Sequence, residues 1–109
     1  MCGIAGFLTS DAAVTREFML SCAASMGRAV EHRGPDDSDV WCDRDAGIAL
    51  AHRRLAVVDL SAAGHQPMTS RGGRFVIAYN GEIYNADEVR GDLEGHAGPI
   101  GWRGHSDTE

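Results

Sequence analysis

The residues best suited to chemistry stand at the start of the chain, in Met1-Cys2-Gly3. Removal of Met1 would leave Cys2 with a thiol and a free α-amino group on one residue. A terminal amine titrates near ~7.7–8.0 and a free thiol near ~8.5, so a useful fraction of the amine is unprotonated at neutral pH. That amine can take the proton of its own thiol, which is the chemistry of an N-terminal nucleophile. The alternative is a reduced, buried cysteine behind an untrimmed start.

Three further segments carry polar side chains in short, dense runs: 32–36 (HRGPD), 53–55 (RRL) and 80–85 (NGEIYN). Asn80-Gly81 is a strong turn signal, and a plain hairpin turn is its simplest interpretation. Arg54 can bind a carboxylate as a planar fork or form an ordinary surface ion pair, and its neighbour Arg53 is expected to do the latter. The histidines and cysteines show no C-x-x-C or H-x-x-x-H spacing, so we expect no metal site.

The first half of the chain supplies elements that can position these residues. Glycine and apolar residues alternate over 3–8, which predicts a strand that holds Cys2 near the interior. Thr15 precedes an amphipathic helix and is a plausible N-cap. Residues 40–42 and 47–52 predict two strands joined by the acidic turn 43–46. The apolar positions of the helix recur at three- and four-residue steps. Its expected buried face comprises Phe18, Cys22, Ala23, Met26 and Val30, and Met19 and Leu20 widen it.

The second half is richer in loops. Residues 61–73 form a long expected loop that could fold over a ligand, with His65 as a loop residue rather than a base. Residues 74–79 give the clearest strand pattern, and a short helix is predicted over 86–93. Residues 94–104 are expected to be loop or weak strand because they hold four glycines and a proline. Ser106 and Glu109 then form a capping-box pattern, as at the start of a further helix.

Composition excludes several classes of protein. The 109 residues carry a net charge of −6, and the pI is about 5.2. This balance argues against nucleic acid or an anionic membrane surface as a partner. No apolar run approaches the ~18 residues that span a bilayer, and no secretory signal is visible. The three cysteines are widely spaced and predict no disulfide framework, so we expect a reducing, cytoplasmic location.

In this order, and with Ser106-Asp107-Thr108-Glu109 behind them, these segments resemble the class II glutamine amidotransferases. Within that class the chain looks like the glutaminase domain of glutamine-hydrolysing asparagine synthetases, and the resemblance covers essentially its whole length. The resemblance implies an α+β fold, the N-terminal half of a four-layer αββα Ntn-hydrolase sandwich. Residues 1–109 would then be a partial glutaminase domain, with the synthetase domain absent. Such a half would leave one apolar sheet face and one sheet edge uncovered.

The resemblance also implies a role for each site residue. Cys2 would be the nucleophile, and the side-chain amide of Asn80 with the backbone N–H of Gly81 would stabilise the oxyanion. Arg54 would bind the α-carboxylate of glutamine, while Asp107, for which a helix cap is the alternative role, would bind the α-ammonium with help from Glu82. Backbone groups of Leu55, Val57 and Val58 would line the pocket. His32 and Arg33 would buttress the loop of the nucleophile, Arg33 would also form a hydrogen bond near Asn80, and Asn85 would support the site.

The implied function is hydrolysis of glutamine to glutamate and ammonia, in the family for ATP-dependent asparagine synthesis from aspartate. The glutaminase step would need no cofactor, and ATP and Mg would act only in the absent synthetase domain. Glutamine is the expected partner, together with a separate synthetase chain or domain. Two alternatives remain open: a truncated, inactive remnant, and a non-catalytic module that binds glutamine or a protein partner.

Overall fold

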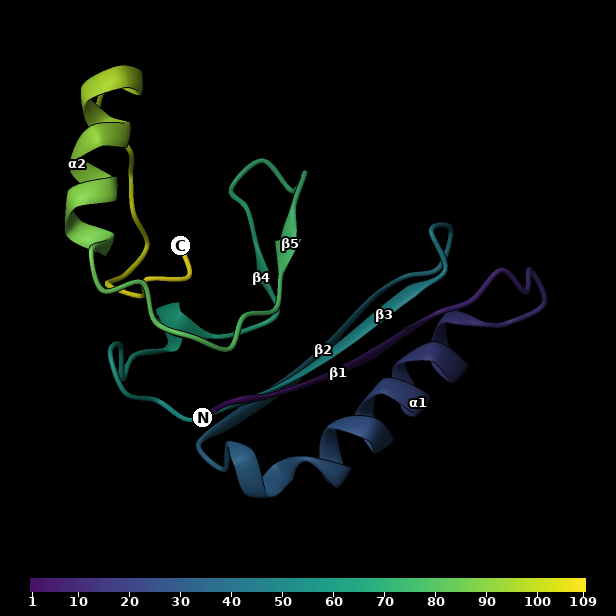
Figure 1. The fold of residues 1–109 in the computed structure, drawn as a ribbon. Helices are drawn as coiled ribbons and strands as arrows, with labels where there is room; N and C mark the ends of the chain where they lie inside the picture. Colours follow the sequence, from purple (N-terminus) through teal and green to yellow (C-terminus); the bar gives the residue numbers. More distant parts are fainter.

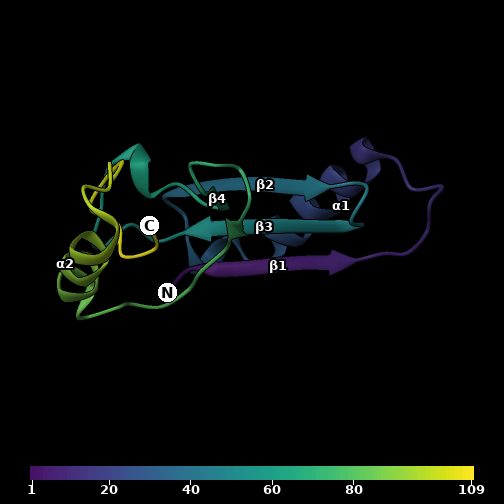
Figure 2. The same ribbon diagram turned by 90° about the horizontal axis from the view of Figure 1, so that it is seen from above.

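The chain forms a small α+β structure in two connected parts in a computed structural model that describes residues 1–109 (Figure 1). An antiparallel sheet with one helix makes up the first part. A small hairpin, a second helix and the C-terminal segment make up the other part. The second helix and the C-terminal segment lie beyond one end of that sheet, whereas the hairpin stands over the sheet face opposite the first helix (Figure 1 and Figure 2). In chain order the elements are β1 (Gly3–Leu8), α1 (Arg16–Ala29), η1 (Glu31–Arg33), β2 (Asp37–Asp43), β3 (Ile48–Arg54), η2 (Ala62–Gly64), β4 (Met68–Thr69), β5 (Val76–Ile77) and α2 (Ala86–Ala97).

The main sheet has the order β1-β3-β2, with antiparallel neighbours throughout. The strand predicted over 3–8 is confirmed, and the two strands predicted around the acidic turn are confirmed and longer than expected. Helix α1 covers one face of this sheet (Figure 2). Met19 and Ala23 of the helix form the core with Cys42, Ala49 and Ala51 of the strands.

The buried face of α1 differs from the predicted one. The helix buries Met19, Ala23 and Gly27, whereas Phe18 is 58% exposed and Met26 also faces outward. A Cβ at Gly27 would lie only 3.2 Å from that of Ala51. Ala23 and Gly27 therefore let the helix approach the sheet closely, Met19 fills the core, and Phe18 and Met26 turn away. Cys22 is half-buried, while the predicted N-cap is confirmed because the Thr15 side chain accepts from the backbone nitrogen of Phe18 at 3.2 Å.

The second part is where the sequence predictions fail most. The strand expected over 74–79 is reduced to Val76–Ile77, which pairs with Met68–Thr69. The expected loop 61–73 contains both η2 and β4, and its residues 66–68 are buried. It is thus a packed wall of the molecule rather than a lid. The strand stops early because the polar backbone groups of Tyr79 bind side chains, as described below, instead of a neighbouring strand.

Helix α2 begins as predicted after Asn85 but continues to Ala97, so residues 94–97 are helical rather than loop or strand. It ends at Gly98, whose φ of 78° is a left-handed conformation that glycine adopts without steric cost. No residue of α2 is buried. Neither helix is long and apolar enough to cross a membrane.

The face of the main sheet opposite α1 carries exposed apolar side chains. Side chains alternate between the two faces of a strand. Because Ala49 and Ala51 face the helix, Ile48 faces the other way, together with Ile4 and Leu8 of β1, which pair with His52 and Ile48. Leu8 is 75% exposed, Ile4 42% and Ile48 36%. On the same face His52 is buried and contacts the carbonyl oxygen of Tyr79.

Candidate functional site

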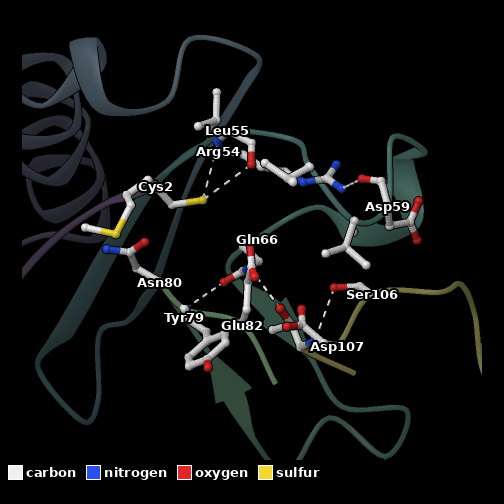
Figure 3. Close-up of a pocket in the computed structure, with 16 residues that line it drawn as sticks. Cys2, Arg54, Leu55, Asp59, Gln66, Tyr79, Asn80, Glu82, Ser106 and Asp107 are labelled. Carbon is white, nitrogen blue, oxygen red and sulfur yellow. Dashed lines mark hydrogen bonds between the residues drawn. The ribbon is translucent and has the colours of Figure 1, made fainter. Parts of the chain in front are cut away.

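A pocket of about 330 Å³ lies where the end of the main sheet meets the second part (Figure 3). That volume is within the usual range of ~300–1,000 Å³ for small-molecule sites. Four separate stretches of the chain form its walls: the N-terminus, residues 54–66, residues 79–82 and residues 106–108. Nine of the residues predicted from the sequence line it, namely Cys2, Arg54, Leu55, Val57, Val58, Asn80, Gly81, Glu82 and Asp107.

Cys2 directly precedes β1, and the residue that follows β3 holds its sulfur. Its Sγ accepts a hydrogen bond from the backbone nitrogen of Leu55 at 3.3 Å and lies 3.7 Å from the carbonyl oxygen of the same residue. A backbone N–H directed at sulfur stabilises negative charge there. Arg33 Nε donates to the Cys2 carbonyl oxygen at 3.1 Å. Met1 is 77% exposed, which leaves it open to an aminopeptidase.

Arg54 forms part of the floor of the pocket. Its side chain is 8% exposed, and Nη1 donates to the carbonyl oxygen of Ser61 at 2.8 Å while Nη2 donates to that of Asp59. These bonds leave further N–H groups of the guanidinium unused, because arginine carries five donors. Arg53 points elsewhere and pairs with Glu31 at 2.7 Å, which confirms the ion pair expected for it, although its side chain is only 11% exposed.

Asp59 connects the Arg54 loop to the C-terminal segment. Its carboxylate accepts from the backbone nitrogen of Ser61 at 2.7 Å and from that of His105 at 3.0 Å. Hydrogen bonds from Ser61, from His105 and again from the backbone of Ser61 lower the pKa of Asp59 to about 2. The carboxylate is therefore ionised at neutral pH and holds residues 104–107 against the pocket.

Two side chains hold Tyr79, the residue before Asn80. The backbone nitrogen of Tyr79 donates to Gln66 Oε1 at 2.6 Å, and its carbonyl oxygen lies 3.1 Å from His52 Nε2. A carbonyl only accepts, so Nε2 carries a proton in this contact. Burial lowers the pKa of His52, in agreement with a neutral ring. Its Nδ1 is buried without a partner.

Asn80 and Gly81 follow directly and reach the pocket from the side opposite Leu55. Asn80 is half-buried, and its side chain makes no hydrogen bond within the protein, so its amide is free for a ligand. Figure 3 shows it between Cys2 and Tyr79. A Cβ at Gly81 would lie 2.5 Å from the Tyr79 hydroxyl oxygen, so the tyrosine ring covers the position where any other residue would place a side chain.

Two acidic residues lie on the other side of the pocket. Asp107 Oδ2 accepts from the backbone nitrogen of Ile83 at 2.7 Å, which ties the C-terminal segment to residues 82–83. Glu82 is exposed beside it. The predicted capping box does not form, because the Glu109 carboxylate accepts from the backbone nitrogens of Arg103 and Gly104, while Ser106 Oγ accepts from that of Thr108.

His65 bridges two carboxylates, a role that its position in an expected loop did not suggest. Its Nδ1 lies 2.6 Å from Asp37 Oδ2 and its Nε2 lies 3.0 Å from Asp39 Oδ2. Both nitrogens can donate only in the imidazolium form. The hydrogen bonds to Asp39 and then Asp37 raise the pKa of His65. This contact fastens the residue before Gln66 to strand β2.

Two of the predicted supporting residues differ in outcome. Arg33 contacts Cys2, as expected of a residue that buttresses the nucleophile, but no hydrogen bond joins it to Asn80. Asn85 is exposed at the start of α2, makes no side-chain cap and lies outside the pocket. Sequence reasoning missed Gln66 and Asp59 as site residues. Asp59 is a polar residue inside the apolar run 55–60, whereas Gln66 follows His65 in the loop and gave no such signal; both are buried in the structure.

No group of three or more His, Cys, Asp or Glu side chains is arranged to hold a metal ion. The pocket instead combines one sulfur nucleophile, neutral amide donors, a buried guanidinium and two carboxylates. Such a set can bind the charged groups of an α-amino acid and attack a carbonyl carbon in its side chain.

Comparison with known proteins places these features in a family. The model of the glutamine amidotransferase domain matches residues 1–109. The glutamine-hydrolyzing asparagine synthetase 2 of Bacillus subtilis is 38% identical over 88% of this chain and 12% of its own length. The asparagine synthetase 3 of the same organism is 38% identical over 100% of this chain and 17% of its own length. A putative asparagine synthetase of Methanocaldococcus jannaschii is 36% identical, with 83% of this chain and 20% of its own length aligned. The chain thus spans at most about a fifth of these relatives.

Proposed function

Because the chain belongs to the glutamine amidotransferase domain family, as found in the N-terminal part of asparagine synthetases, we propose that it hydrolyses glutamine through Cys2. The observation that carries the proposal is the convergence of Cys2, Arg54, Asn80 and Asp107 on one pocket from four distant stretches of sequence.

The proposed reaction starts once Met1 has been removed. The freed α-amine of Cys2 takes the thiol proton, and the thiolate forms a bond to the carboxamide carbon of glutamine. The negative charge that develops on the carbonyl oxygen is met by the Asn80 amide and the Gly81 N–H. The C–N bond then breaks, the α-ammonium of Cys2 protonates the leaving nitrogen, and ammonia departs. Water hydrolyses the resulting thioester to glutamate and restores the thiol.

The zwitterionic end of glutamine, which carries both the α-carboxylate and the α-ammonium, matches the charges of the pocket walls. In our proposal the unused N–H groups of Arg54 bind the α-carboxylate, since a guanidinium fork matches a carboxylate. The carboxylates of Asp107 and Glu82 bind the α-ammonium. Backbone groups of Leu55, Val57 and Val58 complete the wall beside the nucleophile. Arg33 supports Cys2 through its carbonyl oxygen, 3.1 Å away, whereas the exposed Asn85 is left without a role in the reaction.

The wider setting is also proposed from the relatives. We propose that residues 1–109 are the N-terminal part of a glutaminase domain with the four-layer αββα Ntn-hydrolase fold, and that the exposed sheet face of Ile4, Leu8 and Ile48 receives its second sheet. The ammonia would serve ATP-dependent asparagine synthesis, with ATP and Mg in a synthetase domain or chain. The setting would be the cytoplasm, and glutamine hydrolysis itself would use no cofactor.

Glutamine binding without hydrolysis is the alternative that one observation favours. The groups proposed to bind the zwitterion, Arg54 and Asp107, are held by contacts that do not involve Cys2. A chain that kept its Met1 would therefore still offer a binding pocket, although it would lack the free amine that the reaction needs.

The test compares cysteine variants of the natural gene product that contains residues 1–109. Intact mass, before and after treatment with a glutamine-like chloroketone, reports the loss of Met1 and alkylation of the thiol. Cys2→Ala should lower kcat for glutamine hydrolysis by more than about 10³-fold, since the nucleophile is removed. Cys22→Ala, on the half-buried side of α1, is the matched control and should leave kcat unchanged. Hydrolysis that persists in Cys2→Ala would rule out the proposed reaction, and glutamine binding without hydrolysis in the processed protein would favour the alternative.

A further inference from the structure

Gln66 is a buried amide placed between the two halves of the pocket. Its side chain is 6% exposed, and it reaches the pocket from the stretch between η2 and β4 (Figure 3). Oε1 accepts from the backbone nitrogen of Tyr79 at 2.6 Å, and Nε2 donates to Thr108 Oγ1 at 3.2 Å. Both polar atoms of the amide are therefore used, and its orientation is fixed by the need of each atom for its own kind of partner.

The first of these bonds bears on the proposed oxyanion donors. Residue 79 is not part of a strand, so no neighbouring strand holds its backbone. Instead Gln66 holds its N–H and His52 holds its carbonyl oxygen at 3.1 Å. These two side chains therefore fix the direction in which the backbone continues into Asn80 and Gly81.

The second bond bears on the proposed ammonium site. Thr108 follows Asp107 directly, and the backbone nitrogen of Thr108 donates to Ser106 Oγ at 3.2 Å in a tight local turn. A displacement of Thr108 would therefore also displace Asp107. Gln66 itself is fixed from behind, because its neighbour His65 bridges Asp37 and Asp39 of strand β2.

From this geometry we propose that Gln66 is a positioning residue for glutamine hydrolysis, which sets the distance between the oxyanion donors at 80–81 and the ammonium-binding carboxylate of Asp107. The inference rests on the proposed function and adds to it a residue that itself need not touch the reacting atoms. It explains why an amide, with one acceptor and one donor, stands at a buried position where an apolar residue would cost less.

Its two bonds can be tested separately by steady-state kinetics on the natural gene product after Met1 removal. Gln66→Met keeps the length of the side chain but removes the acceptor for Tyr79, and kcat should fall by about 10–100-fold, since small misplacements of catalytic groups are costly. Gln66→Glu keeps that acceptor and should retain kcat within about 3-fold. Thr108→Val removes only the second bond, so KM for glutamine should rise while kcat stays within about 3-fold.

A purely structural role predicts another pattern, in which activity follows the folded fraction and kcat and KM do not separate. Should Gln66→Met fail to fold, Gln66→Asn replaces it, because it withdraws both polar atoms by one methylene and should also lower kcat. Unchanged kcat in the folded variant would overturn the inference while leaving the proposed function intact. A wild-type protein that hydrolyses no glutamine would instead overturn both.

Discussion

The sulfur of Cys2 lies 3.3 Å from the backbone nitrogen of Leu55, so the proposed nucleophile is fixed to the first residue after β3. Arg54 precedes Leu55, and thus the nucleophile and the proposed carboxylate anchor belong to the same sheet. The oxyanion donors belong to the other part of the molecule. Catalysis in this arrangement depends on how accurately the second part presents Asn80 to the sheet.

The side chain of Asn80 should therefore contribute to rate more than to binding. Asn80→Ala is expected to lower kcat by about 10²–10³-fold with little change in KM, which is the usual effect of losing one oxyanion donor. Asn85→Ala is the matched control, because Asn85 is exposed and its side chain caps nothing. Steady-state glutamine hydrolysis would check both, and equal losses in the two variants would contradict the assignment.

Replacement of Arg54 should affect both binding and stability. Arg54→Lys keeps the charge but cannot serve the carbonyl oxygens of Asp59 and Ser61 and a bound carboxylate at once. We expect KM for glutamine to rise at least about 10-fold and the free energy of unfolding to fall by about 1–3 kcal/mol. Arg53→Lys, which can keep the ion pair with Glu31, should change KM little. Kinetics and thermal unfolding measure the two effects, and the assignment fails if the two variants raise KM equally.

The bridge of His65 predicts a pH-dependent contribution to stability. Its pKa is raised above the usual 6.5, first by Asp39 and then by Asp37, so the contribution is complete below that value and is lost as pH rises through the folded pKa. Burial opposes ionisation of Asp37, but the hydrogen bond and charge of His65 outweigh it and the pKa of Asp37 is lowered from 3.8. The stability that the ionised Asp37 carboxylate contributes is lost as pH falls through this lowered pKa.

Thermal unfolding of His65→Gln against wild type should consequently show the largest difference between about pH 4 and pH 6.5, and a smaller one at pH 9. These side chains are 33–52% exposed, so the free-energy difference should stay below about 1 kcal/mol. Arg54 and His52 also face this cluster and are unchanged in the comparison. His32→Gln, at an exposed position in η1, should show no such pH dependence. A difference that grew steadily above pH 7 would contradict the charged bridge.

Replacement by alanine should weaken glutamine binding at Gly64 and increase stability at Gly91. A Cβ at Gly64 would collide with the Arg54 guanidinium, so Gly64→Ala should displace that group and raise KM for glutamine. Gly91, in the interior of α2, has nothing within 4 Å of such a Cβ. Gly91→Ala should leave KM unchanged and raise the free energy of unfolding by about 0.5–1 kcal/mol. Improved stability in Gly64→Ala without a kinetic effect would show that the pocket floor tolerates the added methyl group.

Local sequence patterns predicted the main sheet and both helices, because strand and helix periods are properties of neighbouring residues. They predicted Ala23 and Met19 on the apolar face of α1, and both are buried. They also favoured Phe18 and Met26, which are exposed, and missed Gly27, which is buried because it allows close packing. They overestimated the strand 74–79 because its end is determined by Gln66 and His52, both distant in sequence from Tyr79.

The residues of the candidate site also divide into those that the sequence could identify and those that it could not. Residues of recognisable motifs, such as Cys2 and Asn80-Gly81, could be selected from the sequence, and these line the pocket. Gln66 and Asp59 could not be assigned, because their importance lies in the backbone groups they bind, and these are known only once the chain is folded. Arg33 and Asn85 were included with their motifs although neither lines the pocket.

The exposed Met1 has a practical consequence for anyone who produces this protein. In the proposed reaction the α-amine of Cys2 can act only after the peptide bond between Met1 and Cys2 has been cut. Strong overproduction can outrun the host enzyme that makes this cut. Preparations of equal purity and equal folding would then differ in specific activity, in proportion to the share of molecules that begin with cysteine.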